Sequence, residues 1–512
     1  MSGLFPFHGG LKTVRHKTES NQQPIRWSAL PHRLTVPLRQ HIGAIAKPLA
    51  RAGERVLKGQ MIGQPDGYIS AAIHAPTSGK VIAVEQQPVP HPSGLPDWCV
   101  VIESDGEERW VERQAVDYRR LHPSEVRNRL RSAGVVGLGG AAFPSAVKLN
   151  PSGHAEALET LILNGAECEP WITCDDRIMR ERAAEIIAGL HVIAHLLEPR
   201  EVLIGIEDDK PEAIAAMVAA CAGTGFAVRP VPTRYPSGSV KQLVKLLTAK
   251  ETPVDGLPVD VGVQCFNVGT AYTIYRAIEF GEPVISRTVT ITGHVNQPQN
   301  LEVLLGTPFS ELIAQSGGYR DGVERLIMGG PMMGFAVHDD GVPVTKATNC
   351  LLAASAAELA PLRPVMPCIR CGACVDACPA NLLPQQLYWH ARAKEFDKAQ
   401  DYHLFSCIEC GCCSYVCPSH LPLVQYYRYA KNEIWAQEKE KQKAELARQR
   451  HQARLERLER EKQERDAKLR QKAPASRAVA VENPPNEAVA AHSAKAAPPA
   501  PEPATETGQR SD

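Results

Sequence analysis

The sequence of 512 residues lacks a long apolar segment and carries no net charge. The longest helix-like apolar stretch runs from Ile186 to Leu197 and is interrupted by His191 and His195, well short of the roughly 20 residues that span a bilayer. Lys and Arg together number 57, as do Asp and Glu, so the composition does not indicate nucleic-acid binding. No signal-peptide pattern is present. We therefore expect a reducing, cytoplasmic environment.

Cysteine, by contrast, is abundant, with 15 residues in the chain, and two runs of the same spacing contain most of them. Each run reads Cys-x-x-Cys-x-x-Cys-x-x-x-Cys-Pro, which is typical of [4Fe–4S] sites. In paired runs the first three cysteines hold one cluster and the fourth holds the other. The pattern therefore predicts two clusters, one held by Cys368, Cys371, Cys374 and Cys417 and one by Cys378, Cys407, Cys410 and Cys413.

Zinc and disulfides are the competing interpretations of these cysteines. Structural zinc sites usually have two Cys-x-x-Cys pairs separated by a longer gap, so we favour iron–sulfur clusters. The two-residue spacing and the lack of a signal peptide disfavour disulfides. Cys412 lies between two predicted ligands but out of register. We expect it, and most of the remaining cysteines, to be packed thiols.

Short strands are predicted for residues 30–105, where apolar and polar positions alternate between Gly and Pro residues. Residues 52–63 and 74–81 resemble the barrel-sandwich of lipoyl and biotinyl carrier domains. A carrier domain has its modified lysine at the tip of the hairpin between these stretches. Here the tip, residues 65–69, contains no lysine. We therefore expect a docking or scaffolding domain and not a swinging arm.

Residues 120–250 alternate between strand-length and helix-length apolar runs, which predicts an α/β domain with a largely parallel sheet. At its entrance, residues 137–148 form the Gly-rich loop Gly-Leu-Gly-Gly-Ala-Ala-Phe-Pro-Ser-Ala-Val-Lys. Such a loop lets backbone N–H groups approach a phosphate or a flat ring, and Lys148 can neutralise an anion. The segment Asn-Gly-Ala-Glu-Cys-Glu-Pro at residues 164–170 follows an apolar strand, where α/β domains bind ligands.

Together, the loop and this segment resemble the FMN-binding α/β domain of the complex I 51 kDa subunit, the flavin subunit of NADH:quinone oxidoreductase. With the cluster region included, the order of domains over residues 1 to about 435 is similar to that of the C subunit of the Rnf/Rsx ion-translocating oxidoreductase. The resemblance implies non-covalent FMN as a cofactor and NADH as electron donor. Phe143 and Glu169 would be catalytic residues facing the nicotinamide nucleotide. The implied FMN-binding residues are Gly137, Gly139, Gly140, Lys148, Asn164, Glu167, Asn267 and Thr270.

Two positions depart from the complex I pattern. Ala166 stands where that pattern has Asp, and Gly-Ser-Val at residues 238–240 stands where it has Gly-Glu-Glu. The missing carboxylates weaken the prediction of a dinucleotide site more than the prediction of a flavin site. Two alternatives stay open: a non-catalytic iron–sulfur adaptor without its own NADH site, and an assembly platform built on the barrel-sandwich and the tail. The retained Lys148, Glu167 and Glu169 favour the flavin enzyme.

The remaining segments complete a multidomain α/β plus β architecture. Residues 289–293 and 301–303 are predicted strands and residues 308–316 a short helix, a pattern that resembles the β-grasp soluble-ligand-binding (SLBB) module of the same family. We expect residues 328–334 to form a tight loop packed on the flavin domain. Residues 384–400 favour helix, which indicates an α-helical two-cluster ferredoxin. The predicted domains are a barrel-sandwich hybrid at 1–115, an FMN- and NADH-binding α/β domain at 116–285, an SLBB module at 286–345, a ferredoxin domain at 360–432, a charged helix at 433–472 and a disordered Ala- and Pro-rich tail at 473–512.

The resemblance predicts a peripheral electron-input subunit of a membrane-bound oxidoreductase that translocates ions. It would take electrons from NADH through FMN and pass them through the two clusters to membrane subunits and an iron–sulfur partner subunit. The expected location is the cytoplasmic side of the bacterial inner membrane, with membrane contact through partners. In the Rsx branch of the family, the electrons would keep a redox-sensing transcription regulator reduced.

Overall fold

The computed structural model describes residues 3–150, 158–254, 256–356, 358–359 and 363–472. Residues up to Gln437 belong to one compact unit and those from Glu438 onward to a second. The tail predicted to be disordered, 473–512, lies outside the described residues. Among the described residues, no helix is long and apolar enough to cross a membrane.

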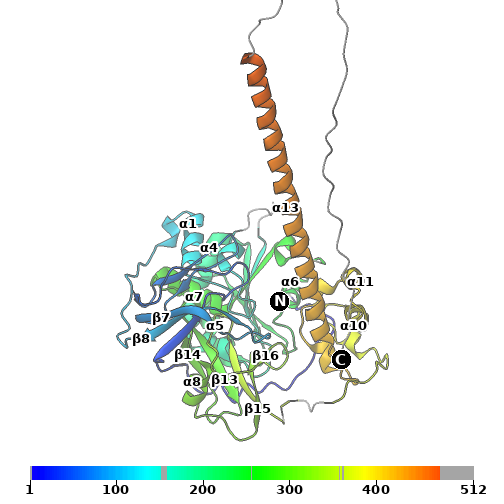
Figure 1. Cartoon of the computed structure of the whole chain (residues 1–512). Helices are drawn as coiled ribbons and strands as arrows, with labels where there is room; N and C mark the ends of the chain where they lie inside the picture. The colour runs from blue at the N-terminus through cyan, green and yellow to red at the C-terminus, as the bar shows by residue number, and fades with distance from the viewer. Residues whose placement is uncertain (1–2, 151–157, 255, 357, 360–362, 473–512) are drawn as a thin grey trace, which may run out of the picture. The chain divides into compact units, whose positions relative to one another are not determined.

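The N-terminal domain contains two small antiparallel sheets and no helix between residues 30 and 105, as the sequence predicts (Figure 1). Alternating inward side chains such as Val36, Ile73 and Ile102 form its core. One sheet has the order β2-β8-β7-β4 and the other β3-β5-β6. The strands are β2 (Arg33–Pro37), β3 (Lys47–Pro48), β4 (Arg55–Val56), β5 (Met61–Gln64), β6 (Ile73–His74), β7 (Gly79–Pro88) and β8 (Pro96–Ser104).

The hairpin tip between β5 and β6, which carries the modified lysine in carrier domains, is attached to the α/β domain. Arg131 donates hydrogen bonds to the carbonyls of Gly67 and Ser70. Asn150 Nδ2 donates to the Tyr68 hydroxyl at 3.1 Å. These contacts attach the tip to the α/β domain, and a docking or scaffolding role for the N-terminal domain stays a prediction.

Four parallel strands form the sheet of the α/β domain, in the order β11-β10-β9-β12. The chain proceeds from β9 (Thr160–Gly165) through β10 (Glu201–Glu207) to β11 (Ala227–Val231), then places β12 (Val263–Asn267) on the other side of β9. Ligands of α/β proteins bind at the carboxyl ends of the strands where the order reverses in this way. The helices of the domain are α1 (Pro123–Ser132), α2 (Ser145–Lys148), α3 (Cys174–Glu181), α4 (Ala183–Leu197), α5 (Pro211–Ala220), α6 (Val240–Thr248) and α7 (Val268–Glu279).

A six-stranded mixed sheet follows, in the order β1-β14-β13-β17-β15-β16. Two of its strands, β1 (Arg26–Trp27) and β17 (Cys350–Ser355), lie outside the predicted module at 286–345. β17 is buried along its whole length between β13 and β15, so its sequence lacks the polar alternation that identifies a strand. The other elements are β13 (Ser286–Gly293), β14 (Gln299–Leu304), α8 (Phe309–Gln315), β15 (Val323–Met328) and β16 (Phe335–Val337).

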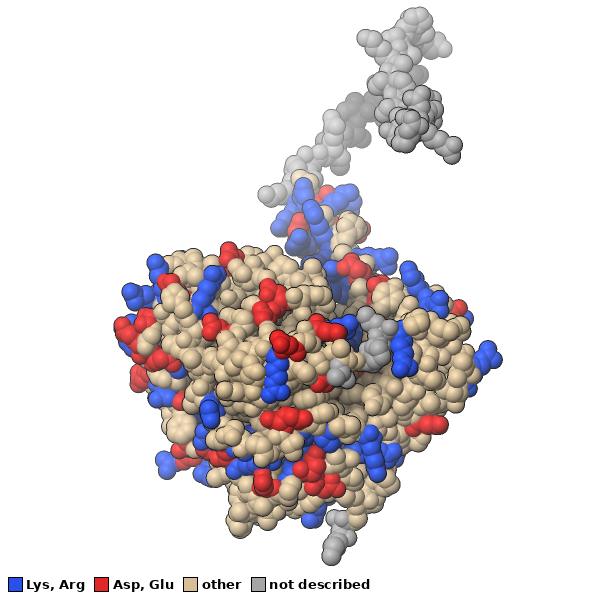
Figure 2. Space-filling view, turned by 90° about the horizontal axis from the view of Figure 1, so that it is seen from below, with Lys and Arg blue, Asp and Glu red and all other residues tan. Residues whose placement is uncertain are grey.

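Short helices surround the two cysteine runs, and a long helix, α13 (Leu423–Lys472), follows them. The start of α13 buries Leu423, Val424 and Tyr427 in the core of the cluster domain. From residue 438 to residue 470 every side chain of α13 is exposed, as predicted for a solvated charged helix. The face of the molecule shown in Figure 2 carries acidic and basic side chains interspersed. The short helices are α9 (Ala373–Asp376), α10 (Pro384–Arg392), α11 (Phe396–Asp401) and α12 (Cys412–Tyr415).

Lys346, a fully buried lysine, connects the N-terminal domain to the α/β domain. Its ammonium group donates to the carbonyl of Ala72 at 2.9 Å and to that of Gly134 at 2.7 Å. Within the described ranges it has no carboxylate partner. Burial lowers the pKa of Lys346 from 10.5 to about 7. A neutral amine still has two hydrogens, enough for both carbonyls.

We expect the stability of the protein to rise with pH above about 7 because of Lys346. In that range the unfolded chain binds the proton up to pH 10.5 while the folded chain has released it, so the unfolding free energy increases with pH. Lys346→Met should abolish this increase. It should also cost about 1–3 kcal/mol in alkaline solution, because two buried carbonyls lose their donor. Chemical denaturation of both proteins at neutral and alkaline pH tests this; the same pH dependence in both would contradict it.

Candidate functional site

Two asparagines meet at the point where the strand order reverses. Asn164 near the end of β9 and Asn267 at the end of β12 are register partners. Asn164 Nδ2 donates to the Gly238 carbonyl at 2.8 Å. Asn267 Oδ1 accepts from the first turn of α7, at Gly269 N, and its Nδ2 donates to Asp175 Oδ2 at 2.6 Å. The two asparagines therefore order the loops around the crevice in which α/β proteins bind ligands.

The Gly-rich loop between α1 and α2 lies against this crevice. Gly137 N donates to the Phe143 carbonyl at 2.8 Å and closes the loop. Leu138 N donates to Thr270 Oγ1 at 2.9 Å, which attaches the loop to α7.

Glycine allows the close approach of this loop to the start of α7. A Cβ on Gly139 would lie 3.2 Å from Nδ2 and Cβ of Asn267. Gly140 has a φ of +127°, which other residues rarely adopt, and the space beside its α-carbon is open. Gly139 and Gly140 are both exposed, so this part of the loop is open to a ligand.

Lys148 ends α2 as a half-buried cation without an acidic partner among the described residues. Its ammonium group donates to the Cys265 carbonyl and lies 4.6 Å from the centre of the Phe266 ring. Burial lowers its pKa. The hydroxyl of Ser145, one turn earlier, is buried and has no hydrogen-bond partner in the part of the chain that the structure describes. An uncompensated cation and a free hydroxyl next to an open glycine loop fit the phosphate of FMN.

Glu167 is buried beneath this crevice, with its side chain 4% exposed. Its carboxylate accepts from the backbone N–H of Asp175 at 2.6 Å and of Asp176 at 3.3 Å, at the start of α3. Burial raises the pKa of Glu167 to about 8, against the attraction of Lys17. Lys17 Nζ lies 3.8 Å from Glu167 Oε2. No sequence signal identifies Lys17, because it lies in an N-terminal segment without a motif.

Glu169 has a different environment from its neighbour. Its Oε1 accepts from Met332 N at 2.6 Å and Met333 N at 3.0 Å. The loop at residues 328–334 therefore packs on this domain, as predicted. Burial raises the pKa of Glu169, against these two N–H groups. Phe143 is half-buried in the Gly-rich loop, and that Phe143 and Glu169 face a nucleotide stays a prediction.

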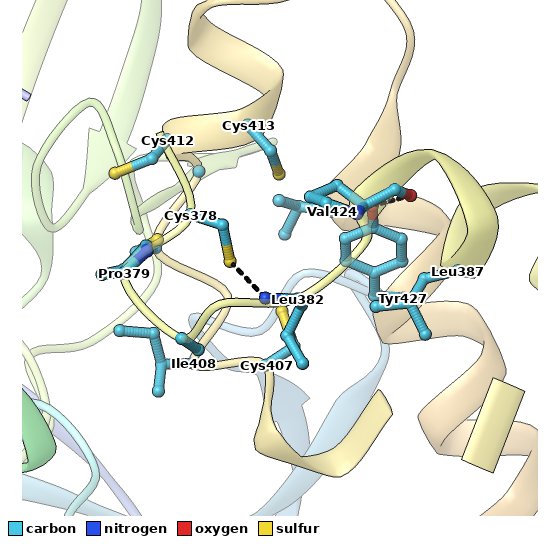
Figure 3. A pocket seen from close by; sticks show the side chains of 14 residues that line it. Cys378, Pro379, Leu382, Leu387, Cys407, Ile408, Cys412, Cys413, Val424 and Tyr427 are labelled. Carbon is cyan, nitrogen blue, oxygen red and sulfur yellow. Dashed lines mark hydrogen bonds between the residues drawn. The ribbon is translucent and has the colours of Figure 1, made fainter. Parts of the chain in front are cut away.

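The eight cysteines of the two runs lie in two groups. The surface group, Cys368, Cys371, Cys374 and Cys417, lines one cavity. The buried group, Cys378, Cys407, Cys410 and Cys413, lines another (Figure 3). Each group contains the fourth cysteine of the opposite run, which is the grouping that the crossed rule gives. Four thiols around each cavity fit a [4Fe–4S] cluster, and the individual iron ligands stay a prediction.

Cys412 also lines the cavity of the buried group and is itself fully buried. In Figure 3 its sulfur points away from Cys378 and Cys413, which point into the cavity. The position of Cys412 is that of a packed thiol, as expected from its register.

The sulfur of Cys378 accepts a hydrogen bond from Leu382 N at 3.4 Å. Such hydrogen bonds help to set cluster potentials.

The buried group lies directly against the α/β domain. The hydroxyl of Tyr235, which is fully buried, donates to the Cys410 carbonyl at 2.7 Å. Gln242 Nε2 donates to the carbonyl of Pro379, next to Cys378, at 3.0 Å. In the surface group, by contrast, Cys371 is exposed. One site is therefore internal and the other is open to solvent.

An α/β domain with a flavin-type crevice, one cysteine group against that domain and a second group at the surface define an iron–sulfur flavoprotein. Comparisons with known families agree with this class. Residues 5–107 match the RnfC barrel sandwich hybrid domain, 130–276 the Nuo51 FMN-binding domain, 288–336 the SLBB domain and 367–421 a 4Fe-4S dicluster domain. The cofactors of the chain are thus FMN and two [4Fe–4S] clusters.

The chain belongs to the family of the C subunits of ion-translocating oxidoreductase complexes. It is 49% identical to the C subunit of Pseudomonas aeruginosa over 91% of the chain and 60% of the relative, and 47% identical to that of Citrobacter koseri over 90% and 65%. With the relative from Vibrio cholerae it shares 48% identity over 92% and 61%. The chain thus spans somewhat less than two thirds of the length of these relatives. A solved NAD⁺-reducing [NiFe]-hydrogenase shares 16% identity and a TM-score of 0.42 over 54% of each chain.

The crossed grouping gives a direct test. Cys378→Ser should remove the cluster of the buried group although Cys378 belongs to the first run, and iron should fall from about eight to about four atoms per chain. Electron paramagnetic resonance of the reduced protein should then lose one of two cluster signals. Cys412→Ser, in the same cavity, is the matched control and should retain both. Loss of the cluster of the surface group in Cys378→Ser would contradict the assignment.

Proposed function

We propose that the chain is the electron-input subunit of an ion-translocating oxidoreductase, taking electrons from NADH and delivering them singly to partner subunits. FMN supplies the chemistry, because a flavin accepts two electrons from a nicotinamide and releases them one at a time to iron–sulfur clusters. One observation carries the proposal: the buried cysteine group lies against the flavin domain through Tyr235, while Cys371 of the other group is exposed.

The residues around the crevice would hold FMN in separate ways. Lys148 would neutralise the phosphate, and the backbone of Gly139 and Gly140 would allow its close approach. Thr270 attaches the loop to α7, and Asn267 accepts from the first turn of α7 beside Gly139. Gly137 closes the loop, and Asn164 and Glu167 would lie beside the flavin.

The exposures of the two cysteine groups support an order of electron transfer. Cys378, Cys410 and Cys413 are buried, so the cluster they would hold receives electrons from within the protein. Around the surface group, Ile369 and Trp389 line the cavity and are 67% and 42% exposed. An apolar rim beside an exposed cluster suits transient contact with a redox partner.

The partners and location follow from the same proposal. Membrane subunits would translocate the ions, and an iron–sulfur partner subunit would accept the electrons. The chain would bind peripherally at the cytoplasmic side of the bacterial inner membrane. In an Rsx-type complex the electrons would keep a redox-sensing transcription regulator reduced. The relatives are named as subunits of an ion-translocating oxidoreductase complex, which supports this assembly.

A second candidate keeps the clusters but has an electron donor other than NADH. The observation that favours it is the carboxylate of Glu169, which already accepts two backbone N–H groups from the loop at 328–334. Val240, which replaces a carboxylate of the complex I pattern, is 37% exposed and adds no charge. An adaptor of this kind would bind FMN or only clusters, and would not oxidise NADH.

Anaerobic titration with NADH separates these functions. If the chain is the NADH entry site, the flavin absorbance should bleach first and the cluster absorbance next. Flavin that responds only to a chemical reductant would indicate a protein donor. Intact clusters without flavin would contradict the flavin enzyme and leave the adaptor.

Two cysteine variants test the order of transfer. In Cys407→Ser, which should lack the buried cluster, NADH should reduce FMN at the wild-type rate while the surface cluster stays oxidised. In Cys371→Ser, which should lack the surface cluster, NADH should reduce both FMN and the buried cluster. Stopped-flow absorbance measures both. Normal reduction of the surface cluster in Cys407→Ser would contradict the order.

A further inference from the structure

The N-terminal segment at residues 15–21 lies along the segment at 167–176 that follows β9. Trp171 N donates to the Arg15 carbonyl at 2.9 Å. The His16 ring stacks on Trp171 with 4.0 Å between ring centres and 2° between planes. Asn21 Nδ2 donates to Asp176 Oδ2 at 3.0 Å. A distant part of the chain thus packs on the segment that contains Glu167 and Glu169.

Lys17 is the centre of this contact and is 8% exposed. Its ammonium group donates to the carbonyls of Glu167 at 2.7 Å, Glu169 at 2.9 Å and Ile172 at 2.5 Å. These three bonds use all of its hydrogens. Glu167 and Trp171 have φ values of 49° and 72°, in the left-handed region that non-glycine residues rarely adopt. The segment is therefore folded around the ammonium group, which offsets the strain.

A continuous series of contacts leads from Lys17 to the Gly-rich loop. Lys17 faces the carboxylate of Glu167, which accepts from the backbone of Asp175. The side chain of Asp175 accepts from Asn267, and Asn267 lies against Gly139. These contacts involve residues implicated in FMN binding or their direct partners. Lys17 is the member that comes from outside the flavin domain.

Among the described residues, no other lysine is placed to replace Lys17. Lys210 is the next lysine whose charge acts on Glu167, but its ammonium group is bonded to Glu207 at 3.2 Å and Asp209 at 2.7 Å. Without Lys17, the buried carbonyls of Glu167, Glu169 and Ile172 would lose their donor. The left-handed backbone at Glu167 and Trp171 would then lose the hydrogen bonds that hold this segment. The Glu167 side chain, which accepts from the backbone of Asp175 and Asp176, would no longer be fixed at the start of α3.

We infer that Lys17 is a positioning residue of the flavin site, which holds Glu167 and the segment after β9 in the conformation that binds FMN. The inference rests on the proposed flavin site and adds a residue that neither flavin motif contains. Lys17 acts through Glu167 and not by contact with the cofactor. The ammonium group holds the backbone of Glu167 and lies 3.8 Å from its carboxyl group. That carboxyl group accepts from the start of α3, and Asp175 of α3 accepts from Asn267.

The test is FMN titration of flavin-free full-length protein by fluorescence quenching. Lys17→Met should weaken FMN binding at least about tenfold, while iron content stays at the wild-type value. Hydrogen exchange should show faster exchange of the Asp175 and Asp176 amides, which is a readout independent of flavin. Lys17→Arg, which keeps the charge, should recover part of the affinity. Unchanged FMN affinity in Lys17→Met would overturn the inference and leave the proposed function intact.

Two controls separate positioning from general destabilisation. Lys346→Met removes another buried lysine bonded to carbonyls, and Lys12→Gln changes an exposed lysine of the same N-terminal region; both should bind FMN as the wild type does. A fall in affinity in Lys346→Met equal to that in Lys17→Met would overturn a specific role.

The double variant Lys17→Met with Glu167→Gln tests the route. If Lys17 acts through Glu167, the loss in the double variant should be smaller than the product of the two single losses. A loss of FMN affinity in the double variant equal to the product of the two single losses would contradict action through Glu167. Failure of the wild type itself to bind FMN would overturn the proposed function together with this inference.

Discussion

The reversal of strand order at β9 is the constraint on which the rest of the site depends. Because β10 and β11 lie on one side of β9 and β12 on the other, the loops after β9 and β12 diverge and leave a crevice between them. Asn164 and Asn267 are register partners at that edge, so their positions follow from backbone pairing. The Gly-rich loop, the start of α7 and the segment after β9 all converge there.

Lysines bonded to backbone carbonyls recur in this protein. Lys346 joins two domains, Lys17 joins the N-terminal segment to the flavin domain, and Lys148 lies inside the crevice. Lys17 and Lys346 are buried where two or more backbone carbonyls converge, so each fixes separate segments with one side chain. Of the three, Lys148 alone has a single carbonyl partner, and this difference in coordination distinguishes the lysine suited to a ligand from the two that are structural.

Features with a local sequence pattern were predictable. The cysteine spacing predicted the two groups because the spacing itself defines the geometry of a cluster loop, and the alternation of apolar runs predicted the parallel sheet. Features that depend on distant parts of the chain were not predictable. β17 has no polar alternation because both its faces are buried, and β1 is too short to form a pattern. Lys17 could not be predicted for the same reason, because its proposed role comes from a contact with Glu167, which lies 150 positions later in the sequence.

The exchange of fourth cysteines between the two groups also constrains how the protein matures. Cys368, Cys371 and Cys374 leave the ribosome before Cys417, which lies in the second run and completes the wall of their cavity. The cavity of the later run, in turn, includes Cys378 from the earlier one. Neither set of four thiols exists before the whole region between the runs has been synthesised and folded back. With these cysteines as ligands, insertion of either complete cluster would follow the synthesis of both runs, and a chain truncated between the runs would offer iron only an incomplete site.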